Sequence, residues 1–260
     1  MLRRIAGYKA LYKKYHDPKS IFVYQMGKVG STALEQSIDN AIHIHNFYSK
    51  SHPCSLRLKG LAGFGWRYYL KRLEQEFELF IKRLAFRRRA HTKIVTLVRP
   101  ALERNISMFF HDLDCYLYAL YSNCDRTKFS PMATRTQDPQ ALIKAFEMHY
   151  QQSYPLTWFD DELKKMTGLD IYAEPFDMAK GLVIVRNNNF EVMCLDIKVL
   201  PKSTEQLSDF LGQSVVLKRA NQAQSKWYAA LYGQFKCNYT PSPELTQLLK
   251  NSKYSTHFFK

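Results

Sequence analysis

Residues 21–33 restrict the fold of this chain more than any other segment. They read Ile-Phe-Val-Tyr-Gln-Met-Gly-Lys-Val-Gly-Ser-Thr-Ala, an apolar strand that runs directly into a polar turn. A helix that begins at such a turn has backbone N–H groups without intrahelical partners at the positive end of its dipole, where an anion is stabilised. Gly27 and Gly30 let the backbone approach a ligand closely, and Lys28 adds a positive charge. The segment therefore predicts a phosphate-binding loop between a strand and a helix.

The spacing of this turn excludes two common phosphate-binding motifs. A Walker A loop needs Lys directly after its last Gly, whereas Lys28 comes two residues before Gly30. The Rossmann pattern needs three closely spaced glycines, and this turn contains one pair. Because many helices begin with Ser or Thr as the N-cap, simple capping by Ser31 or Thr32 is the alternative for this turn taken alone.

A second segment points to the same edge of a sheet. Residues 93–98 form an apolar run rich in β-branched residues, which is typical of a central parallel strand buried on both faces. The run ends at Arg99, Pro100 suits the first position of a helix, and Ser107 follows about two turns later. Carboxyl ends of parallel strands bind ligands at one shared edge, so we expect Arg99 to lie near Lys28. The alternatives are that Arg99 caps a neighbouring helix and that Ser107 is an ordinary helical residue.

Together, these two motifs resemble the sulfotransferases that use 3′-phosphoadenosine 5′-phosphosulfate (PAPS). In that family a strand, the motif K-x-G-[ST]-[ST] and a helix precede a later strand that ends in Arg, with Ser eight residues further on. The resemblance implies that Arg99 and Ser107 bind the 3′-phosphate and that the 5′-phosphosulfate is held by Lys28, Val29, Gly30, Ser31 and Thr32. It also implies an α/β fold of the P-loop-NTPase-like kind, with a central parallel sheet flanked by helices. PAPS would be the cosubstrate, and no metal is implied.

The chain departs from the family pattern at three positions. The best-known cytosolic members have Pro before the Lys and Trp after the hydroxyl pair, where this chain has Gly27 and Ala33. Many relatives read Arg-Asp-Pro or Arg-Asn-Pro, whereas Pro100 directly follows the Arg of this chain. The spacing from Arg to Ser is unchanged, so these departures say little about the acceptor.

The later part of the chain resembles a bacterial branch of capsular polysaccharide synthesis proteins. The similar segments are residues 154–176, which include Trp-Phe-Asp-Asp-Glu-Leu, and residues 221–236, which begin Asn-Gln-Ala-Gln-Ser-Lys-Trp-Tyr. The implied function is transfer of a sulfuryl group from PAPS to a carbohydrate hydroxyl in capsular or extracellular polysaccharide synthesis. The alternatives are a nucleotide-dependent phosphotransferase, and a basic protein with an inactive nucleotide fold that binds nucleic acid or membranes. The sulfotransferase interpretation requires no nucleic acid partner.

A general base is expected at the end of the second strand. Residues 42–45 read Ile-His-Ile-His, so both histidines lie on one face of a strand. His45 is the one nearer the ligand edge, and a neutral imidazole suits removal of a hydroxyl proton. By motif, Lys28 is the catalytic group at the leaving oxygen. A structural histidine is the alternative for His45, and Glu103 and His111 are fallback candidates, although Glu103 is expected to pair with a basic residue.

Composition bounds the remaining properties. At 260 residues and 46 % apolar content, residues 1–260 are expected to form one sulfotransferase-like domain. The net charge of +15 implies an anionic partner. The five cysteines include no C-x-x-C spacing, which predicts reduced thiols. The sequence contains neither the apolar core of a signal peptide nor an apolar run long enough to span a membrane. We therefore expect a cytoplasmic protein, which in one interpretation is peripheral to the inner membrane.

Two basic stretches have more than one interpretation. Residues 1–19 contain a basic amphipathic helix that either lies on an anionic membrane or docks on its own domain, and docking is favoured because most such helices face a core. Residues 66–89 repeat the pattern and end in three arginines, which form either a solvated helix end or a polyanion site.

Several local elements can also be predicted. Helices are expected over residues 139–152 and 159–166, and a loop over residues 127–137. Residues 182–186 and 190–195 predict a hairpin whose Asn residues 187–189 take left-handed conformations. Residues 203–206 have the spacing of a capping box before a helix that ends near Gly212.

Overall fold

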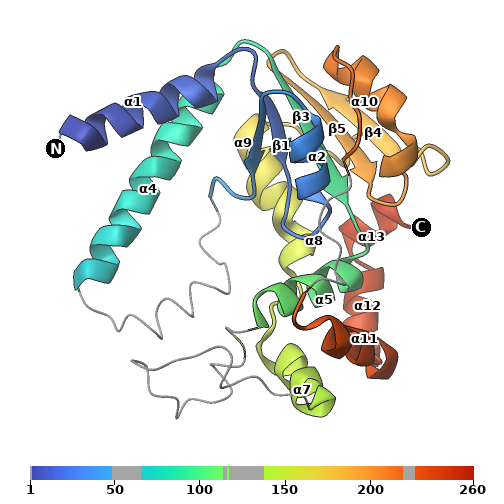
Figure 1. Ribbon diagram of the computed structural model, residues 1–260. Helices are drawn as coiled ribbons and strands as arrows, with labels where there is room; N and C mark the ends of the chain where they lie inside the picture. Colours follow the sequence, from blue (N-terminus) through green and yellow to red (C-terminus); the bar gives the residue numbers. More distant parts are fainter. Residues whose placement is uncertain (1, 49–65, 114–115, 117–137, 219–225) are drawn as a thin grey trace.

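The computed structural model describes the chain except for residues 1, 49–65, 114–115, 117–137 and 219–225 (Figure 1). Its centre is a five-stranded sheet in the order β2-β1-β3-β5-β4. Four strands are parallel and β4 runs antiparallel at one edge. The strands are β1 (Ile21–Tyr24), β2 (Ala41–Ile44), β3 (Thr92–Val98), β4 (Leu182–Arg186) and β5 (Phe190–Asp196). The predicted α/β class with a central sheet flanked by helices is confirmed, and the sheet is parallel except for β4.

The middle strand has the burial that its apolar sequence predicts. Five consecutive residues at the end of β3 are buried, and the strand pairs with β1 on one side and β5 on the other. Strand β1 ends at Tyr24, before it can pair with the last residues of β3. There the Gln25 side chain takes the place of a backbone partner, and its Oε1 accepts from the Leu97 N–H at 3.0 Å. The main chain after β1 can therefore turn away from the sheet while the buried Leu97 N–H of β3 keeps a hydrogen-bond partner.

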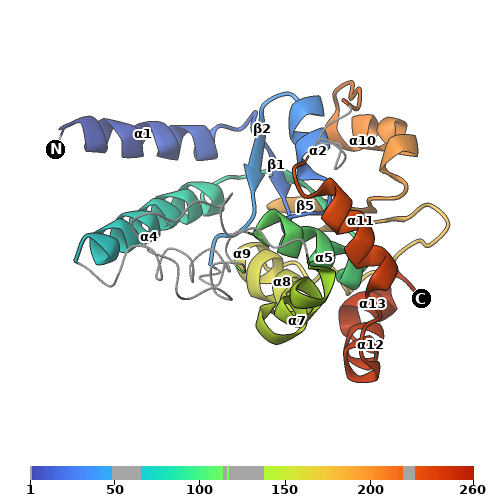
Figure 2. The same ribbon diagram turned by 60° about the horizontal axis from the view of Figure 1, so that its bottom comes forward.

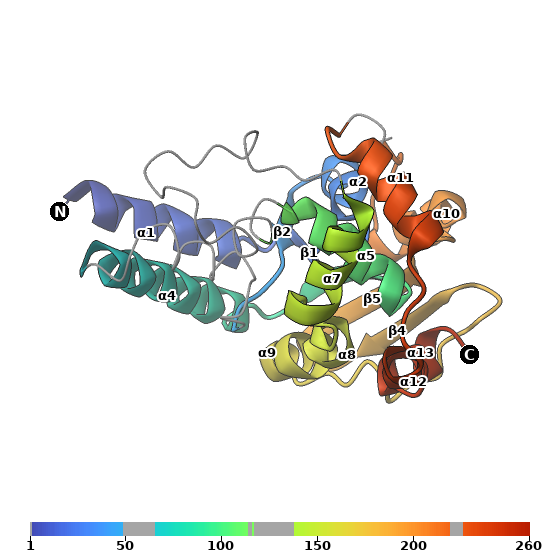
Figure 3. The same ribbon diagram turned by 90° about the horizontal axis from the view of Figure 1, so that it is seen from below.

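Helices cover both faces of the sheet. Figure 3 shows α2 (Ser31–Ser37) and α10 (Thr204–Leu211) on one face. On the other face, α8 (Tyr154–Trp158) continues through a π-helical turn (Phe159–Lys164) into α9 (Lys165–Thr167). The helix predicted over residues 159–166 is therefore longer than expected and changes its hydrogen-bonding pattern midway.

A second, aromatic core supports α5 (Ala101–His111) beneath the carboxyl edge of the sheet. It lies where α5 meets α7 (Pro139–His149) and α11 (Ala229–Asn238), as Figure 2 shows. The Phe146 ring lies 5.3 Å from that of Phe109 and 5.6 Å from that of Phe235, and all three side chains are fully buried. Two helices far apart in the sequence, α7 and α11, thus fix the position of α5, the helix that follows Arg99.

The ends of these helices correct some of the expectations. Pro100 is the N-cap of α5 and not its first residue. Helix α7 begins at Pro139 as predicted but ends at His149, and the Asp138 side chain caps it by accepting from the Gln140 N–H at 2.9 Å. The predicted capping box is wrong because the Ser203 hydroxyl donates to the carbonyl of Val199, the last residue before a 3₁₀ turn (Leu200–Lys202). Gly212 ends α10 in a left-handed conformation, as predicted.

The β4–β5 hairpin forms, but its turn differs from the prediction. None of the residues 187–189 has a positive φ. The Asn187 carboxamide oxygen instead accepts from the N–H groups of Asn189 and Phe190 at 3.0 and 2.8 Å, an Asx-type turn. Two short helices, α12 (Pro243–Lys250) and α13 (Lys253–Phe258), complete the described chain.

Two long helices pair with each other beside the sheet. Figure 1 shows α1 (Leu2–His16) and α4 (Trp66–Arg87) close together near the sheet and extending away from it on the same side. The Tyr8 and Phe77 rings meet edge to face at 4.8 Å. At the base of α1, the buried Tyr15 ring lies 5.9 Å from that of Phe22 in β1. Helix α1 thus docks on its own domain, mainly through α4.

The arginine run after α4 is partly buried. Arg89 is 4 % exposed, and its guanidinium donates to Thr92 Oγ1 at 2.8 Å and to the Ser20 carbonyl at 2.9 Å. For this residue the expected solvated helix end is wrong, because it ties the segment after α1 to the start of β3.

None of the helices that the structure describes has both the length and the apolar character needed to cross a bilayer. Cys194 and Cys237 are free thiols, and the other three cysteines lie outside the described residues, as does the loop expected over residues 127–137.

Candidate functional site

A tight loop joins β1 to α2 at the carboxyl edge of the sheet. Gly30 is the N-cap of α2, with a φ of 100°. This left-handed conformation favours glycine, and a Cβ on Gly30 would lie 3.0 Å from Ile197 Cδ1, a tight contact that the Ile197 side chain would have to relieve by shifting. Lys28 has a φ of 70°, a conformation that non-glycine residues rarely adopt and that is often found at functional sites. The alternative that Ser31 or Thr32 is the N-cap is wrong, since Ser31 is the first helical residue.

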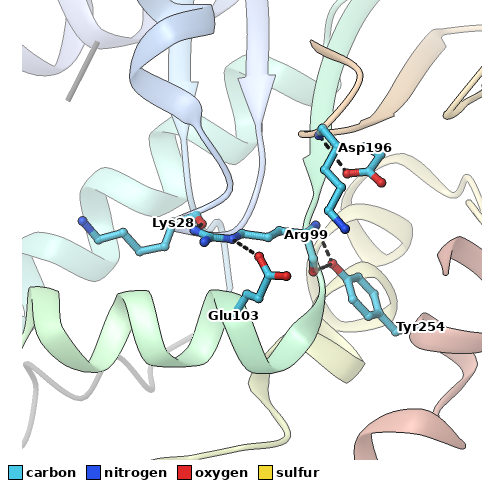
Figure 4. A network of polar contacts seen from close by, with 6 residues as sticks. Lys28, Arg99, Glu103, Asp196 and Tyr254 are labelled. Carbon is cyan, nitrogen blue, oxygen red and sulfur yellow. Dashed lines mark hydrogen bonds and ion pairs between the residues drawn. The ribbon is translucent and has the colours of Figure 1, made fainter. Parts of the chain in front are cut away.

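The Lys28 ammonium lies in a positively charged environment. Its side chain is half-buried and extends away from Arg99 along α5 (Figure 4). Burial lowers the pKa of Lys28, the nearby Asp112 carboxylate raises it, and the charges of Lys226, Arg104 and Arg99 lower it further. An anion at this loop would relieve the repulsion among these cations.

Arg99 lies next to the Lys28 loop, as its place at the end of β3 predicts. Its Nη1 is 3.4 Å from the Lys28 carbonyl oxygen, and its Nε is 3.3 Å from Glu103 Oε2 (Figure 4). The Tyr254 hydroxyl donates to the Arg99 carbonyl at 2.7 Å and accepts from the Arg99 N–H at 3.1 Å. The guanidinium therefore contacts the loop and not the end of a neighbouring helix, and Glu103 pairs with a basic residue as expected.

The remaining residues of the two motifs take different positions. Val29 is fully buried, so only its backbone is available to a ligand. Thr32 lies half-buried in the first turn of α2, next to Ser31, whose backbone opens that helix. Ser107 is half-buried on α5, one turn beyond Glu103 and on the same face. Both motifs thus lie at one edge of the sheet.

His45 directly follows β2, and its ring reaches the same loop. Its Nδ1 lies 2.9 Å from the Gln25 carbonyl oxygen, which can only accept, so the neutral ring carries its proton on Nδ1 and its lone pair on Nε2. His45 Cε1 is 3.8 Å from the position that a Cβ on Gly27 would occupy. His43 lies nearby, with ring centroids 4.3 Å apart, and its Nδ1 is 3.3 Å from Glu35 Oε2. The fallback candidate His111 is the last residue of α5.

Arg104 is a buried cation beneath the loop that sequence reasoning missed. It is 1 % exposed, and it donates to the Gly27 carbonyl oxygen at 2.9 Å and to the Tyr150 hydroxyl at 2.7 Å. Its guanidinium also lies 4.7 Å from the centre of the Tyr154 ring. In the described part of the chain, no carboxylate forms an ion pair with it. The available signal was its spacing from Ala101 and Met108, which places it on the buried face of α5.

Residues from the C-terminal half hold these groups in place. The Trp158 indole N–H donates to the His45 carbonyl oxygen at 3.1 Å. The buried Glu162 carboxylate accepts from the Tyr24 hydroxyl at 2.8 Å and from the Phe47 N–H at 2.6 Å. The segment that carries His45 is thus fixed on both sides. Sequence reasoning singled out this Trp-Phe-Asp-Asp-Glu motif only as a resemblance.

Comparison with known proteins gives one match. Neither the curated proteins nor the solved structures include a significant match to this chain. The model of the NKWYS family, described as "Putative capsular polysaccharide synthesis protein", matches residues 142–260. The matched segment begins within α7, so Lys28, His45, Arg99 and Ser107 lie before it, whereas Trp158 and Tyr254, which hydrogen-bond the backbone of His45 and of Arg99, lie inside it. Over residues 142–260 the chain is therefore similar to a family assigned to capsular polysaccharide synthesis.

Proposed function

We propose that this protein is a sulfotransferase that moves a sulfuryl group from PAPS to a carbohydrate hydroxyl in capsular or extracellular polysaccharide synthesis. The observation that carries the proposal is the 3.4 Å contact between Arg99 Nη1 and the Lys28 carbonyl oxygen, which joins two anion-binding motifs 71 residues apart. The NKWYS match supports the carbohydrate acceptor, and the sequence motifs support the nucleotide cosubstrate.

The charges of the site fit a ligand with more than one phosphate. Lys28, Arg99, Arg104 and Lys226 are close enough for the last three to lower the pKa of the first. Arg104 adds a fixed charge that has no ion-pair partner among the described residues, and burying a charge in this way is costly unless something compensates it. Bound phosphates would supply that compensation, and the N-terminus of α2 would add backbone donors.

Each candidate residue has a role in this proposal. Lys28 stabilises the negative charge that develops on the departing phosphate oxygen, together with the loop N–H groups. Arg99 and Ser107 hold the 3′-phosphate and so orient the cosubstrate. His45 Nε2 accepts the proton of the acceptor hydroxyl as its oxygen attacks sulfur and the bond from sulfur to the phosphate oxygen breaks. Bound PAPS supplies the sulfuryl group, and the protein's own cations neutralise the phosphates.

Binding of the product nucleotide tests the proposal most directly. Adenosine 3′,5′-bisphosphate without Mg²⁺ should raise the melting temperature, by about 5–10 °C at a hundred times its Kd for a chain of this size. Lys28→Ala should abolish this shift and sulfuryl transfer while the protein stays folded, and Arg99→Ala should weaken bisphosphate binding. Lys19→Ala is the matched control, because this exposed lysine precedes β1 at the opposite edge of the sheet.

Other outcomes would favour the alternatives. Stabilisation by ATP only with Mg²⁺ would indicate a phosphotransferase. Binding of short DNA or anionic vesicles, with no shift by either nucleotide, would indicate a binding protein. Full activity of His45→Ala would remove the proposed base and leave the nucleotide site intact.

A further inference from the structure

The arm formed by α1 and α4 carries an exposed apolar stripe. Its α4 members recur at intervals of three and four residues, so they share one face of that helix. Trp66 and Leu73 are 68 % and 66 % exposed, although each is large and apolar. The complete stripe on α4 comprises Trp66, Tyr69, Leu70, Leu73, Phe77 and Phe80. A contiguous exposed apolar surface of this kind marks a docking site.

The stripe continues beside α1. Phe77 contacts Tyr8 of α1, so the two helices share a seam along the stripe. Ile5 of α1 is also exposed and stands four and eight residues before the exposed Lys9 and Lys13, in one row of that helix. Apolar and basic side chains therefore share the exposed surface of the arm.

The charge of the arm restricts its partner. Helix α1 has five basic and no acidic residues, and α4 has six basic and three acidic residues, so together they carry a net charge of +8. Two such arms would repel each other, which argues against a second copy of the chain as the occupant. Nucleic acid would match the charge but would leave the apolar stripe in water. A surface that is both anionic and apolar matches both properties.

The base of the arm is rigid. Tyr15 is buried at the foot of α1, and Arg89 joins the segment after α1 to β3. The Arg83 guanidinium of α4 donates to the Phe47 carbonyl oxygen at 2.6 Å. These contacts couple the orientation of the arm to that of the sheet, so a surface that binds the arm also orients the domain.

We propose that the α1–α4 arm docks on an anionic lipid bilayer, with the stripe of α4 in the interfacial region and the basic residues of α1 at the headgroups. Amphipathic helices with Trp, Phe and Leu on one face and Lys or Arg beside it bind membranes in this manner. Aromatic residues such as Trp66 and Tyr69 favour that interface. Surface attachment agrees with the finding that no described helix can span a bilayer. The inference does not depend on the proposed sulfotransferase activity.

Vesicle co-sedimentation of the full chain tests this proposal. The protein should bind vesicles of phosphatidylcholine with about one third phosphatidylglycerol and bind pure phosphatidylcholine far more weakly. Lys13→Gln with Lys14→Gln should lower the partition coefficient about 25-fold, since each basic residue near an anionic surface contributes about fivefold. Leu70→Glu with Leu73→Glu should abolish binding. Leu248→Glu is the matched control, an exposed leucine on α12 outside the arm.

Each contrary result would overturn the proposal. Equal binding to both kinds of vesicle would show that charge has no role, and full binding by the Leu70/Leu73 variant would show that the stripe has none. A chain that is dimeric in solution and becomes monomeric in that variant would show that a second copy covers the stripe. Unchanged melting temperatures of the variants, with bisphosphate binding retained, separate loss of docking from loss of fold or of the nucleotide site.

Discussion

Removing one hydroxyl group should loosen the strand end that carries Arg99. Tyr254 is fully buried in α13, and its hydroxyl is the partner of both the N–H and the carbonyl of Arg99, at 3.1 and 2.7 Å. Tyr254→Phe keeps the ring and its packing against Phe159 and Phe258. The change therefore removes two hydrogen bonds and creates no cavity beyond one oxygen atom.

The magnitude follows from the two groups left behind. A buried backbone donor or acceptor that loses its partner costs about 1–3 kcal/mol. With two such groups, and some relaxation of the strand end, we expect the free energy of unfolding to fall by about 2–4 kcal/mol. This is a large part of the ~5–15 kcal/mol that a natural domain has, so urea denaturation should show a clearly lower midpoint. Bisphosphate affinity should fall as well, because Arg99 loses its fixed backbone.

Tyr172→Phe provides the matched control for this experiment. Tyr172 packs on the same Phe159 and Phe258 rings, but its buried hydroxyl oxygen has no hydrogen-bond partner among the described residues. Removing it should leave the stability unchanged or slightly higher. Equal effects of the two substitutions, or a loss below about 0.5 kcal/mol for Tyr254→Phe, would refute the reasoning that this hydroxyl holds Arg99.

Three further predictions concern the elements around the loop. Gly30→Ala should cost about 1–3 kcal/mol in thermal or urea unfolding, because a left-handed conformation and the contact with Ile197 both oppose a Cβ. Glu162→Gln should cost about 2–4 kcal/mol, since an amide cannot replace every acceptor that the carboxylate offers to the Tyr24 hydroxyl and the N–H groups that face it. Burial lowers the pKa of His43 below its usual value of 6.5, although the Glu35 carboxylate opposes this shift. Below pH 6.5 the unfolded chain therefore binds more protons at His43 than the folded protein does, and the free energy of unfolding should fall as the pH drops through the lowered pKa. In His43→Asn the free energy of unfolding, measured by urea denaturation, should depend less on pH below 6.5. An unchanged dependence would show that other groups cause the loss of stability in acid.

The elements that sequence reasoning predicted share a local cause. Apolar runs mark the strands β1 and β3, and parallel strands necessarily end at one edge, so the pattern of residues alone places Lys28 and Arg99 together. The same rule placed His45 at that edge, because its strand also runs parallel to β1. Glycine at the helix N-terminus was expected from the need for close approach of a ligand, whereas in the structure the left-handed conformation of Gly30 is what favours glycine there.

The features that sequence reasoning missed depend on contacts between distant segments. The spacing of Arg104 from Ala101 and Met108 places it on the buried face of α5, but its partners Tyr150 and Tyr154 lie at least 46 residues away, so the sequence does not show what holds the buried guanidinium. Tyr254 lies 155 residues from the backbone that it holds, and no local pattern records such a pairing. The hairpin turn was predicted from the left-handed tendency of Asn, but the Asn187 side chain satisfied the turn amides instead.

The two halves of the chain contribute to the candidate site in different ways. The charged candidates Lys28, Arg99 and Arg104 all precede the matched segment. From inside it, Tyr150 accepts from the Arg104 guanidinium, Tyr254 holds the Arg99 backbone, and the Trp158 indole donates to the His45 carbonyl oxygen. These supporting groups are buried, so without them the loop and the end of β3 would present unsatisfied polar groups and an uncompensated guanidinium. The first half alone therefore lacks the hydroxyl groups that hold the Arg104 guanidinium and the Arg99 backbone in place.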